Sequence, residues 1–127
     1  IMSVTVTEVL LKTASKFSQK DAIKYKESGA WKSMNWLQYK NEIFDFARGL
    51  LGLGLSEGEF VTILSKNCSQ WVIGNIGSIV AGAVPAGIYQ TSSPEQCEYI
   101  INHCRASVIL VENHKQLKKI WEIREQL

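Results

Sequence analysis

The sequence is poor in residues that hold metals or form disulfides, with three cysteines, two histidines and no Cys-x-x-Cys pair. Cys97 and Cys104 are seven residues apart in a segment of helical character, so their Cα atoms lie about 10 Å apart, too far for a disulfide. His103 falls on a different helical face from Cys97 and is adjacent to Cys104, which is not typical of a metal site or a Cys–His nucleophile pair. We therefore expect buried free thiols in a reducing compartment and no metal site.

Clustered charge of one sign is also absent. The chain has 14 Lys and Arg against 12 Asp and Glu, and its net charge is +2. Segments such as KKIWEIRE (118–125) mix both signs, whereas a nucleic-acid-binding face would group its basic residues, so no nucleic-acid partner is expected. The opening IMSVTVTEVLLKTASK has no basic start before an apolar core, which argues against a secretory signal. We expect a cytoplasmic protein, and peripheral contact with an intracellular membrane stays open.

The run 67–94 contains no charged residue. A membrane span is excluded because its helical part, 71–83, has about 13 residues where about 20 are required. A dinucleotide-binding loop is excluded because Gly74 and Gly77 fall inside a predicted helix, not between a strand and a helix. A G-x-x-x-x-G-K-[ST] phosphate loop is absent from the sequence. We interpret the run as a buried helix followed by a buried strand.

The first 57 residues predict a helix, a β-hairpin and a long amphipathic helix. The first helix lies near 5–17 and opens with a Thr-x-x-Glu capping box. Residues 22–34 alternate in polarity around a Glu-Ser-Gly-Ala turn, which is typical of a hairpin. The long helix follows Asn35, which has a glutamine three residues later, and it ends near Gly52.

From about residue 60, short apolar strands alternate with helices. Strands are predicted at 60–66, 84–89 and 107–113, with helices at 69–82, 92–105 and 114–127. Helical connections between apolar strands imply a parallel sheet with right-handed crossovers and both faces covered. The expected fold class is therefore α/β, a Rossmann-like three-layer parallel sheet of βαβαβα order, preceded by the helix, hairpin and long helix. We divide the chain into a lead-in, 1–57, and a parallel α/β unit, 58–127, within a single subdomain, 1–127.

A polar loop follows the second of these predicted strands, where the chain turns toward the next helix. Ligands of open α/β sheets bind along the edge formed by the carboxyl ends of the strands. The main candidates for a binding site are therefore Tyr89, Gln90, Thr91 and Ser92. A structural alternative is at least as strong, because Ser93, Pro94 and Gln96 have the pattern of a helix start.

Three segments, taken in order, resemble the N-terminal region of the AMP-forming acyl-CoA synthetases, the adenylate-forming enzymes. MNWLQYKNEI (34–43) is similar to that family's T-[WY]-x-[EQ]-[LYF] segment, and GEFVTILSKNCSQW (58–71) to its G-[DE]-x-V-x-[IL]-x-x-x-N-x-x-x-W segment. AGAVPAGIYQTSSPEQCEYI (81–100) is similar to its A-G-A-[VI]-x-[VA]-x-[IL]-Y-x-T-x-[ST]-x-E segment. Each motif alone is weak, but three in order at the right spacing are specific. KESGAWKSMNW, GIYQTSSPE and VENHKQLKKI look most like the long- and very-long-chain fatty acyl-CoA ligases of the bubblegum type.

The resemblance implies a parent enzyme that converts a fatty acid and ATP, with Mg²⁺, into an acyl adenylate and then transfers the acyl group to CoA. It implies that the loop 89–92 lies near the pantetheine path of CoA and that Lys115 comes near the CoA phosphates. A solvated surface lysine is the structural alternative for Lys115. The family's phosphate loop, its adenine and ribose motifs and its catalytic lysine do not occur in the sequence. We therefore expect an N-terminal fragment with no catalytic residue, no bound cofactor and no activity of its own. The alternative is a stand-alone interaction or ligand-binding α/β module.

The tryptophans and the last predicted helix also carry structural expectations. The four tryptophans are interpreted as core or partly buried anchors, and Trp71, on the most apolar helix, is the candidate for a fatty-acid tunnel. KQLKK (115–119) is interpreted as a solvated face. A subdomain taken from a larger sheet exposes apolar surface where the missing part packs, so we expect self-association.

Overall fold

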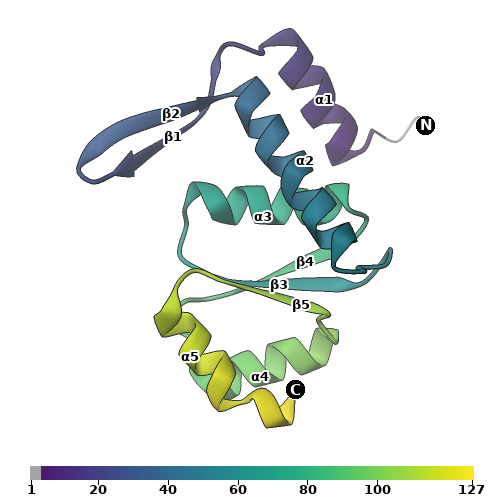
Figure 1. Ribbon diagram of the computed structural model, residues 1–127, viewed down its shortest axis with the longest axis vertical. Helices are drawn as coiled ribbons and strands as arrows, with labels where there is room; N and C mark the ends of the chain where they lie inside the picture. Colours follow the sequence, from purple (N-terminus) through teal and green to yellow (C-terminus); the bar gives the residue numbers. More distant parts are fainter. Residues whose placement is uncertain (1–3) are drawn as a thin grey trace.

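A computed structural model describes residues 4–127, and this described part alternates between helices and strands in the predicted order (Figure 1). Residues 1–3 of the segment considered for a secretory signal lie outside the described residues. The elements are α1 (Val6–Lys16), β1 (Asp21–Glu27), β2 (Ala30–Asn35), α2 (Trp36–Gly52), β3 (Phe60–Leu64), α3 (Ser69–Val80), β4 (Val84–Ile88), α4 (Pro94–Cys104), β5 (Val108–Val111), α5 (His114–Glu122) and a 3₁₀ turn (Arg124–Gln126).

The lead-in forms the predicted helix, hairpin and helix. The Asn35 side chain accepts the Gln38 N–H over 2.8 Å, and the Gln38 side chain accepts the Asn35 N–H over 2.9 Å, which is the predicted capping box. Thr5 forms the same box at the start of α1. β1 and β2 pair antiparallel around a turn that contains Gly29 at φ +82°, a conformation that glycine adopts without strain.

The second half has the predicted three layers, a parallel sheet with helices on both faces. The strand order is β4-β3-β5, and β3 pairs in parallel with both neighbours. Helix α3 covers one face of this sheet, and α4 and α5 cover the other (Figure 1). Helix α2 packs on the outer side of α3 and thereby joins the lead-in to the sheet.

The central strand β3 carries the core between the two helical layers. Its residues 61–64 are buried on both faces because helices cover both sides of the sheet. Leu64 packs with Ile88 and Ile101 on the side of α4 and α5. Full burial of a side chain of this size contributes about 1.5–3 kcal/mol, so this cluster anchors the carboxyl ends of the strands.

Small residues let α3 approach its neighbours closely. A Cβ atom on Gly77 would lie 2.6 Å from Cδ1 of Phe46 and 3.1 Å from the backbone oxygen of Ile43, both on α2. A Cβ atom on Gly74 would lie 3.0 Å from Cδ1 of Leu110 on β5. The absence of side chains at these positions therefore sets the spacing of α3 from both α2 and the sheet.

The interpretation of the uncharged run is right for the helix and wrong for the strand. Helix α3 buries Ile73, Gly77 and Ser78. Strand β4, however, lies at the edge of the sheet, and its Val84 is 41% exposed. An edge strand keeps one flank open, so uncharged sequence here does not require complete burial. No helix within the described residues is long and apolar enough to cross a bilayer.

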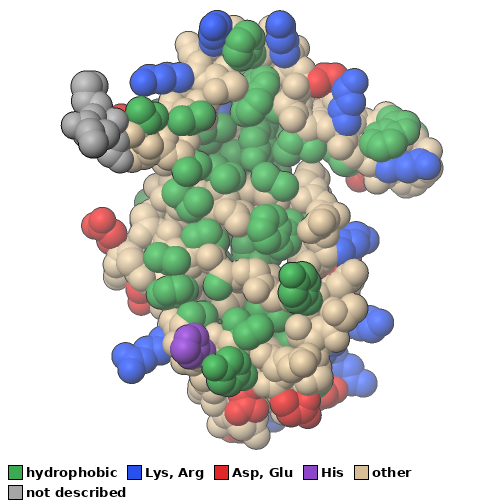
Figure 2. Space-filling model, turned by 180° about the vertical axis from the view of Figure 1, so that it is seen from behind, with side chains coloured by type: hydrophobic (Ala, Val, Ile, Leu, Met, Phe, Trp, Pro, Cys, Tyr) green, Lys and Arg blue, Asp and Glu red, His purple; other side chains and the backbone are tan. Residues whose placement is uncertain are grey.

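The interpretation of the four tryptophans as core or partly buried anchors holds for only two of them. Trp36 and Trp71 are partly buried, whereas Trp31 is 73% exposed and Trp121 is 63% exposed. Trp31 is the second residue of β2, close to the hairpin turn, and the Trp121 ring centroid lies 5.1 Å from the Arg124 guanidinium carbon. Hydrophobic side chains are also visible over the middle of one face of the molecule (Figure 2).

Candidate functional site

The carboxyl ends of the three parallel strands meet at one edge of the sheet. Leu64 pairs with Ile88 on one side and with Val111 on the other, so all three strands stop at the same level. The segments that follow are 65–68, 89–93 and 112–113. This edge is where open α/β sheets bind ligands, and it contains the predicted loop.

The predicted loop forms a tight turn directly after β4. The Ser92 N–H donates a hydrogen bond to the Tyr89 carbonyl over 2.9 Å. The Tyr89 side chain is 84% exposed, whereas Ser92 is buried. The loop borders a depression of about 630 Å³ lined by Tyr89, Thr91, Ser92, Glu95, Gln96, Tyr99 and Ile100. Three of the four predicted residues thus line one surface, and Gln90 is outside its lining.

The structural alternative for this region, a helix start, is also confirmed. The Ser93 side chain accepts the Gln96 N–H over 3.3 Å, and the Gln96 side chain accepts the Ser93 N–H over 2.9 Å. Pro94 occupies the first helical position, where its missing N–H costs nothing. The cap uses Ser93 and leaves the side chains of 89–92 free for another role.

Two side chains of α5, Gln116 and Lys119, hold the loop, and the sequence pattern did not predict this contact. The Lys119 ammonium group donates to the carbonyls of Gln90, over 2.7 Å, and of Ser92, over 2.8 Å. The Gln116 amide donates to the Gln90 carbonyl over 3.3 Å. The interpretation of 115–119 as a solvated face is therefore wrong for Gln116 and Lys119. Gln116 lies one turn before Ile120, which packs on the core, and this spacing is the signal that could have located it.

Lys115, the other predicted site residue, is exposed in the first turn of α5. This helix begins after Asn113, whose side chain accepts the Gln116 N–H over 3.1 Å. Lys119, one turn further along α5, donates to the Gln90 carbonyl, so the helix that carries Lys115 also contacts the loop 89–92.

An ion pair links the segments that follow β3 and β5. The Glu112 carboxylate accepts the Lys66 N–H over 3.1 Å and lies 3.1 Å from the Lys66 ammonium nitrogen. These contacts with the backbone and side chain of Lys66 lower the pKa of Glu112. The side chain of Glu112 is 15% exposed and that of Lys66 is 59% exposed, so the carboxylate is the more enclosed member of the pair.

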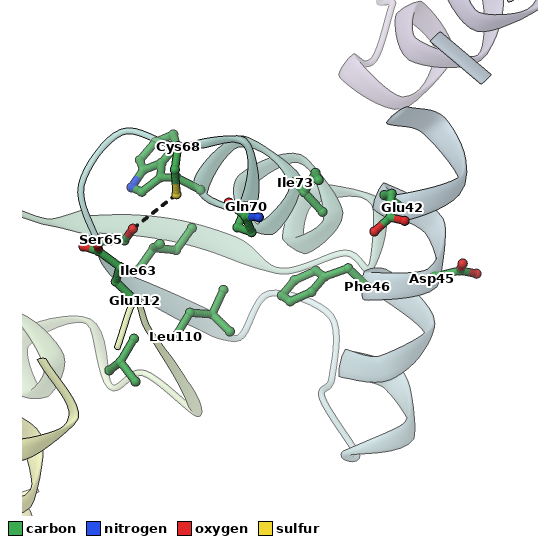
Figure 3. A pocket seen from close by; sticks show the side chains of 12 residues that line it. Glu42, Asp45, Phe46, Ile63, Ser65, Cys68, Gln70, Ile73, Leu110 and Glu112 are labelled. Carbon is green, nitrogen blue, oxygen red and sulfur yellow. Dashed lines mark hydrogen bonds between the residues drawn. The ribbon is translucent and has the colours of Figure 1, made fainter. Parts of the chain in front are cut away.

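A second cavity, of about 510 Å³, lies between α2, α3 and the sheet (Figure 3). Its apolar lining comes from Phe46, Ile63, Trp71, Ile73, Leu110 and Val111, and its polar lining from Glu42, Asp45, Ser65, Cys68, Gln70 and Glu112. Trp71, the sequence-based candidate for a fatty-acid tunnel, is among them. Phe46 reaches in from α2, a contact that sequence spacing did not predict because its partners are on other elements.

The three cysteines are free, as expected, but only Cys97 is buried. Burial raises the pKa of the Cys97 thiol, which makes it a poor nucleophile. The Cys68 sulfur lies 3.6 Å from the Ser65 hydroxyl oxygen at the cavity, and Cys104 is partly exposed. The expectation that all three thiols are buried is therefore wrong for Cys68 and Cys104.

The sequence is similar to known ligases along nearly its whole length. It is 37% identical to a long-chain-fatty-acid–CoA ligase of Xenopus laevis over 98% of this chain and 17% of that protein. It is likewise 37% identical to a long-chain-fatty-acid–CoA ligase of Rattus norvegicus over 97% of this chain and 17% of that protein. The chain thus spans about a sixth of the length of these curated relatives.

Solved structures of CoA ligases contain the same fold as this chain. The anthranilate CoA ligase AuaEII, solved in complex with anthranoyl-AMP, aligns with a TM-score of 0.90 at 28% identity over 100% of this chain and 24% of that one. A benzoate CoA ligase from Burkholderia xenovorans aligns with a TM-score of 0.85 at 17% identity, over 98% of this chain and 24% of that ligase. At this low identity the alignment supports the fold alone. Residues 10–127 match the family described as AMP-binding enzyme. The chain therefore belongs to the family of AMP-binding enzymes, in agreement with the acyl-CoA synthetase resemblance read from its motifs.

Proposed function

We propose that this chain is the N-terminal part of a long-chain fatty acid–CoA ligase. Such a ligase joins a fatty acid carboxylate to the AMP moiety of ATP, releasing pyrophosphate, and then transfers the acyl group to the thiol of CoA, releasing AMP. The observation that carries the proposal is 37% identity to long-chain-fatty-acid–CoA ligases along 98% of the chain. The motifs at 34–43, 58–71 and 81–100 support the same assignment.

We propose that the carboxyl edge of the sheet faces CoA in the parent enzyme. Tyr89, Thr91 and Ser92 line the depression beside α4, and Lys115 is exposed at the start of the helix that holds this loop. An exposed ammonium group suits a phosphate, and a polar loop beside an apolar depression suits a pantetheine arm. In this proposal Gln90 acts through its backbone carbonyl, which fixes the loop to α5.

We propose that the residues of this chain do not themselves hold ATP or Mg²⁺. Within residues 4–127, no group of three or more His, Cys, Asp or Glu side chains is placed to hold a metal ion. The sequence also lacks the family's phosphate loop and its catalytic lysine, which stabilise developing charge. We therefore propose that ATP and Mg²⁺ bind elsewhere in the parent protein and that residues 1–127 form one subdomain without catalysis of its own. The free cysteines support a reducing, cytoplasmic location.

The test compares the isolated chain with the full-length protein that contains it. Each is incubated with a long-chain fatty acid, ATP, Mg²⁺ and CoA, and acyl-CoA and AMP are measured. We expect acyl-CoA and AMP in equal amounts from the full-length protein and neither from the chain alone. Turnover by the isolated chain would contradict the proposed inactivity. Absence of turnover by the full-length protein, with retained ligand binding, would favour a stand-alone binding module.

A further inference from the structure

Lys119 directs its charged end at the backbone of the loop 89–92. Its ammonium nitrogen lies 2.7 Å from the Gln90 carbonyl oxygen and 2.8 Å from the Ser92 carbonyl oxygen. Hydrogen bonds from a charged donor are about twice as strong as neutral ones, so two on a short turn restrict it strongly. The contact spans 27 to 29 residues of sequence and joins the loop after β4 to helix α5.

Gln116 adds a second, more deeply buried contact to the same carbonyl. Its side chain is 4% exposed and its amide nitrogen donates to the Gln90 carbonyl over 3.3 Å. Its Oε1 atom accepts no hydrogen bond from any residue among 4–127, so a buried acceptor is left without a protein partner beside the loop. Burying an unpaired amide oxygen costs on the order of 1–3 kcal/mol, which core packing alone would not favour over an apolar side chain.

An ordinary surface loop would not require this arrangement. Connections between elements are usually the mobile part of a fold, and ordering one residue costs about 1–2 kcal/mol of conformational entropy. Lys119 is partly buried, although a lysine in the last turn of a short helix could extend into solvent. The sequence thus places a cation and an amide where their only evident effect is to fix the loop relative to α5.

We propose that Lys119, assisted by Gln116, is a positioning residue that holds the loop 89–92 and Lys115 at a fixed separation for CoA. This proposal rests on the proposed function, because it names how the CoA-side surface is preorganised. Lys119 itself does not touch the substrate. It acts by removing the entropy that CoA binding would otherwise lose in ordering the loop.

The experiment uses the full-length protein with three variants. Lys119→Met removes the charged donor but keeps the apolar stem, and Lys119→Arg retains a charged donor. Lys118→Met removes the charge of the exposed neighbouring lysine and serves as the matched control. Hydrogen exchange is followed in the peptide that contains the loop, with the peptide of β3 as an internal measure of folding. Steady-state kinetics give the KM values for CoA, ATP and fatty acid.

We expect Lys119→Met to speed exchange in the loop about tenfold while β3 is unchanged, and to raise the KM for CoA roughly 5- to 20-fold, with the KM values for ATP and fatty acid near those of the wild type. Lys119→Arg retains the charged donor, so its loop exchange and its KM for CoA should stay close to those of the wild type. Lys118→Met should likewise change neither quantity. Unchanged loop exchange in Lys119→Met, or an equal effect of Lys118→Met, would overturn the structural part. Faster loop exchange with an unchanged KM for CoA would overturn the role in CoA binding. If the full-length protein makes no acyl-CoA, the proposed function fails, and loop exchange still decides whether Lys119 holds the loop.

Discussion

At the scale of single residues, the Lys66–Glu112 pair ties together two of the three segments at the carboxyl edge. Glu112 accepts the Lys66 N–H and lies beside the Lys66 ammonium group, while its own N–H donates to the Leu64 carbonyl over 3.1 Å. These interactions favour the ionised carboxylate, so the pKa of Glu112 falls below its ordinary value of 4.5 in the folded chain. The pair thereby makes the stability of this edge depend on pH.

Glu112→Gln should therefore destabilise the chain at neutral pH and lose its effect in acid. A carboxylate whose pKa is lowered by folding stabilises the fold above its unfolded-state pKa, and this stabilisation is lost as pH falls through the lowered value. The unfolding free energy of wild type and variant, from urea denaturation, should differ at pH 7 and converge below pH 4.5. Glu122→Gln, at an exposed carboxylate on α5, is the control, and its unfolding free energy should stay close to that of the wild type at pH 7. A constant difference across the whole pH range would contradict the role of the ion pair.

The candidate site shows what residue patterns can and cannot predict. The loop 89–92 was predicted because a polar tetrapeptide between an apolar strand and a capped helix marks the carboxyl end of a strand. Lys119 was missed because its partners are backbone carbonyls 27 and 29 residues away, and backbone carbonyls leave no trace in side-chain sequence. Local pattern thus locates a loop, whereas the side chains that hold it depend on tertiary packing.

At the scale of elements, order and starting points follow from the sequence, and helix spacing does not. Asn35 and Ser93 were identified as caps because each is followed three residues later by glutamine, and both form the predicted hydrogen bonds. The tight crossing of α2 over α3 was not predicted. Gly77 is one of several small residues in α3, and the sequence does not say which of them meets the neighbouring helix.

Two glycine substitutions on these helices should have opposite effects. Gly77→Ala should lower the unfolding free energy by about 1–2 kcal/mol, because a Cβ atom 2.6 Å from Phe46 and 3.1 Å from a backbone oxygen overpacks the crossing by more than the helix gains from alanine. Gly49→Ala, in α2, should raise it by about 0.5–1 kcal/mol, because a Cβ atom there meets nothing within 4 Å. Urea denaturation measures both. A stabilising Gly77→Ala would show that the helices are not in close contact.

At the scale of the whole molecule, the sheet has two edges that no other strand among residues 4–127 covers. Within the described residues, β4 and β5 each pair with β3 alone. Pro85 removes one hydrogen-bond donor from β4, which weakens that edge as a template for pairing. Residues 108–111 of β5 are all apolar and partly exposed, and no proline interrupts them. An edge of this kind pairs readily with another strand, so β5 is the stronger site of association.

We therefore expect the isolated chain to self-associate. Besides the edge of β5, apolar side chains are exposed over one face of the molecule (Figure 2). Tyr89 and Tyr99, beside the carboxyl edge, are 84% and 69% exposed. Sedimentation velocity across a range of concentrations should give a mean mass that rises above the 14.3 kDa of the monomer.

Association through apolar surface and strand pairing should persist at high salt, whereas association through charge should weaken, because salt screens charges and sulfate strengthens apolar burial. The full-length protein is the matched comparison. If the remainder of the proposed ligase packs against β5, its presence should abolish the concentration dependence that arises from this surface. A chain that stays at monomer mass at every concentration, with and without sulfate, would show that the edge of β5 is protected without the rest of the protein.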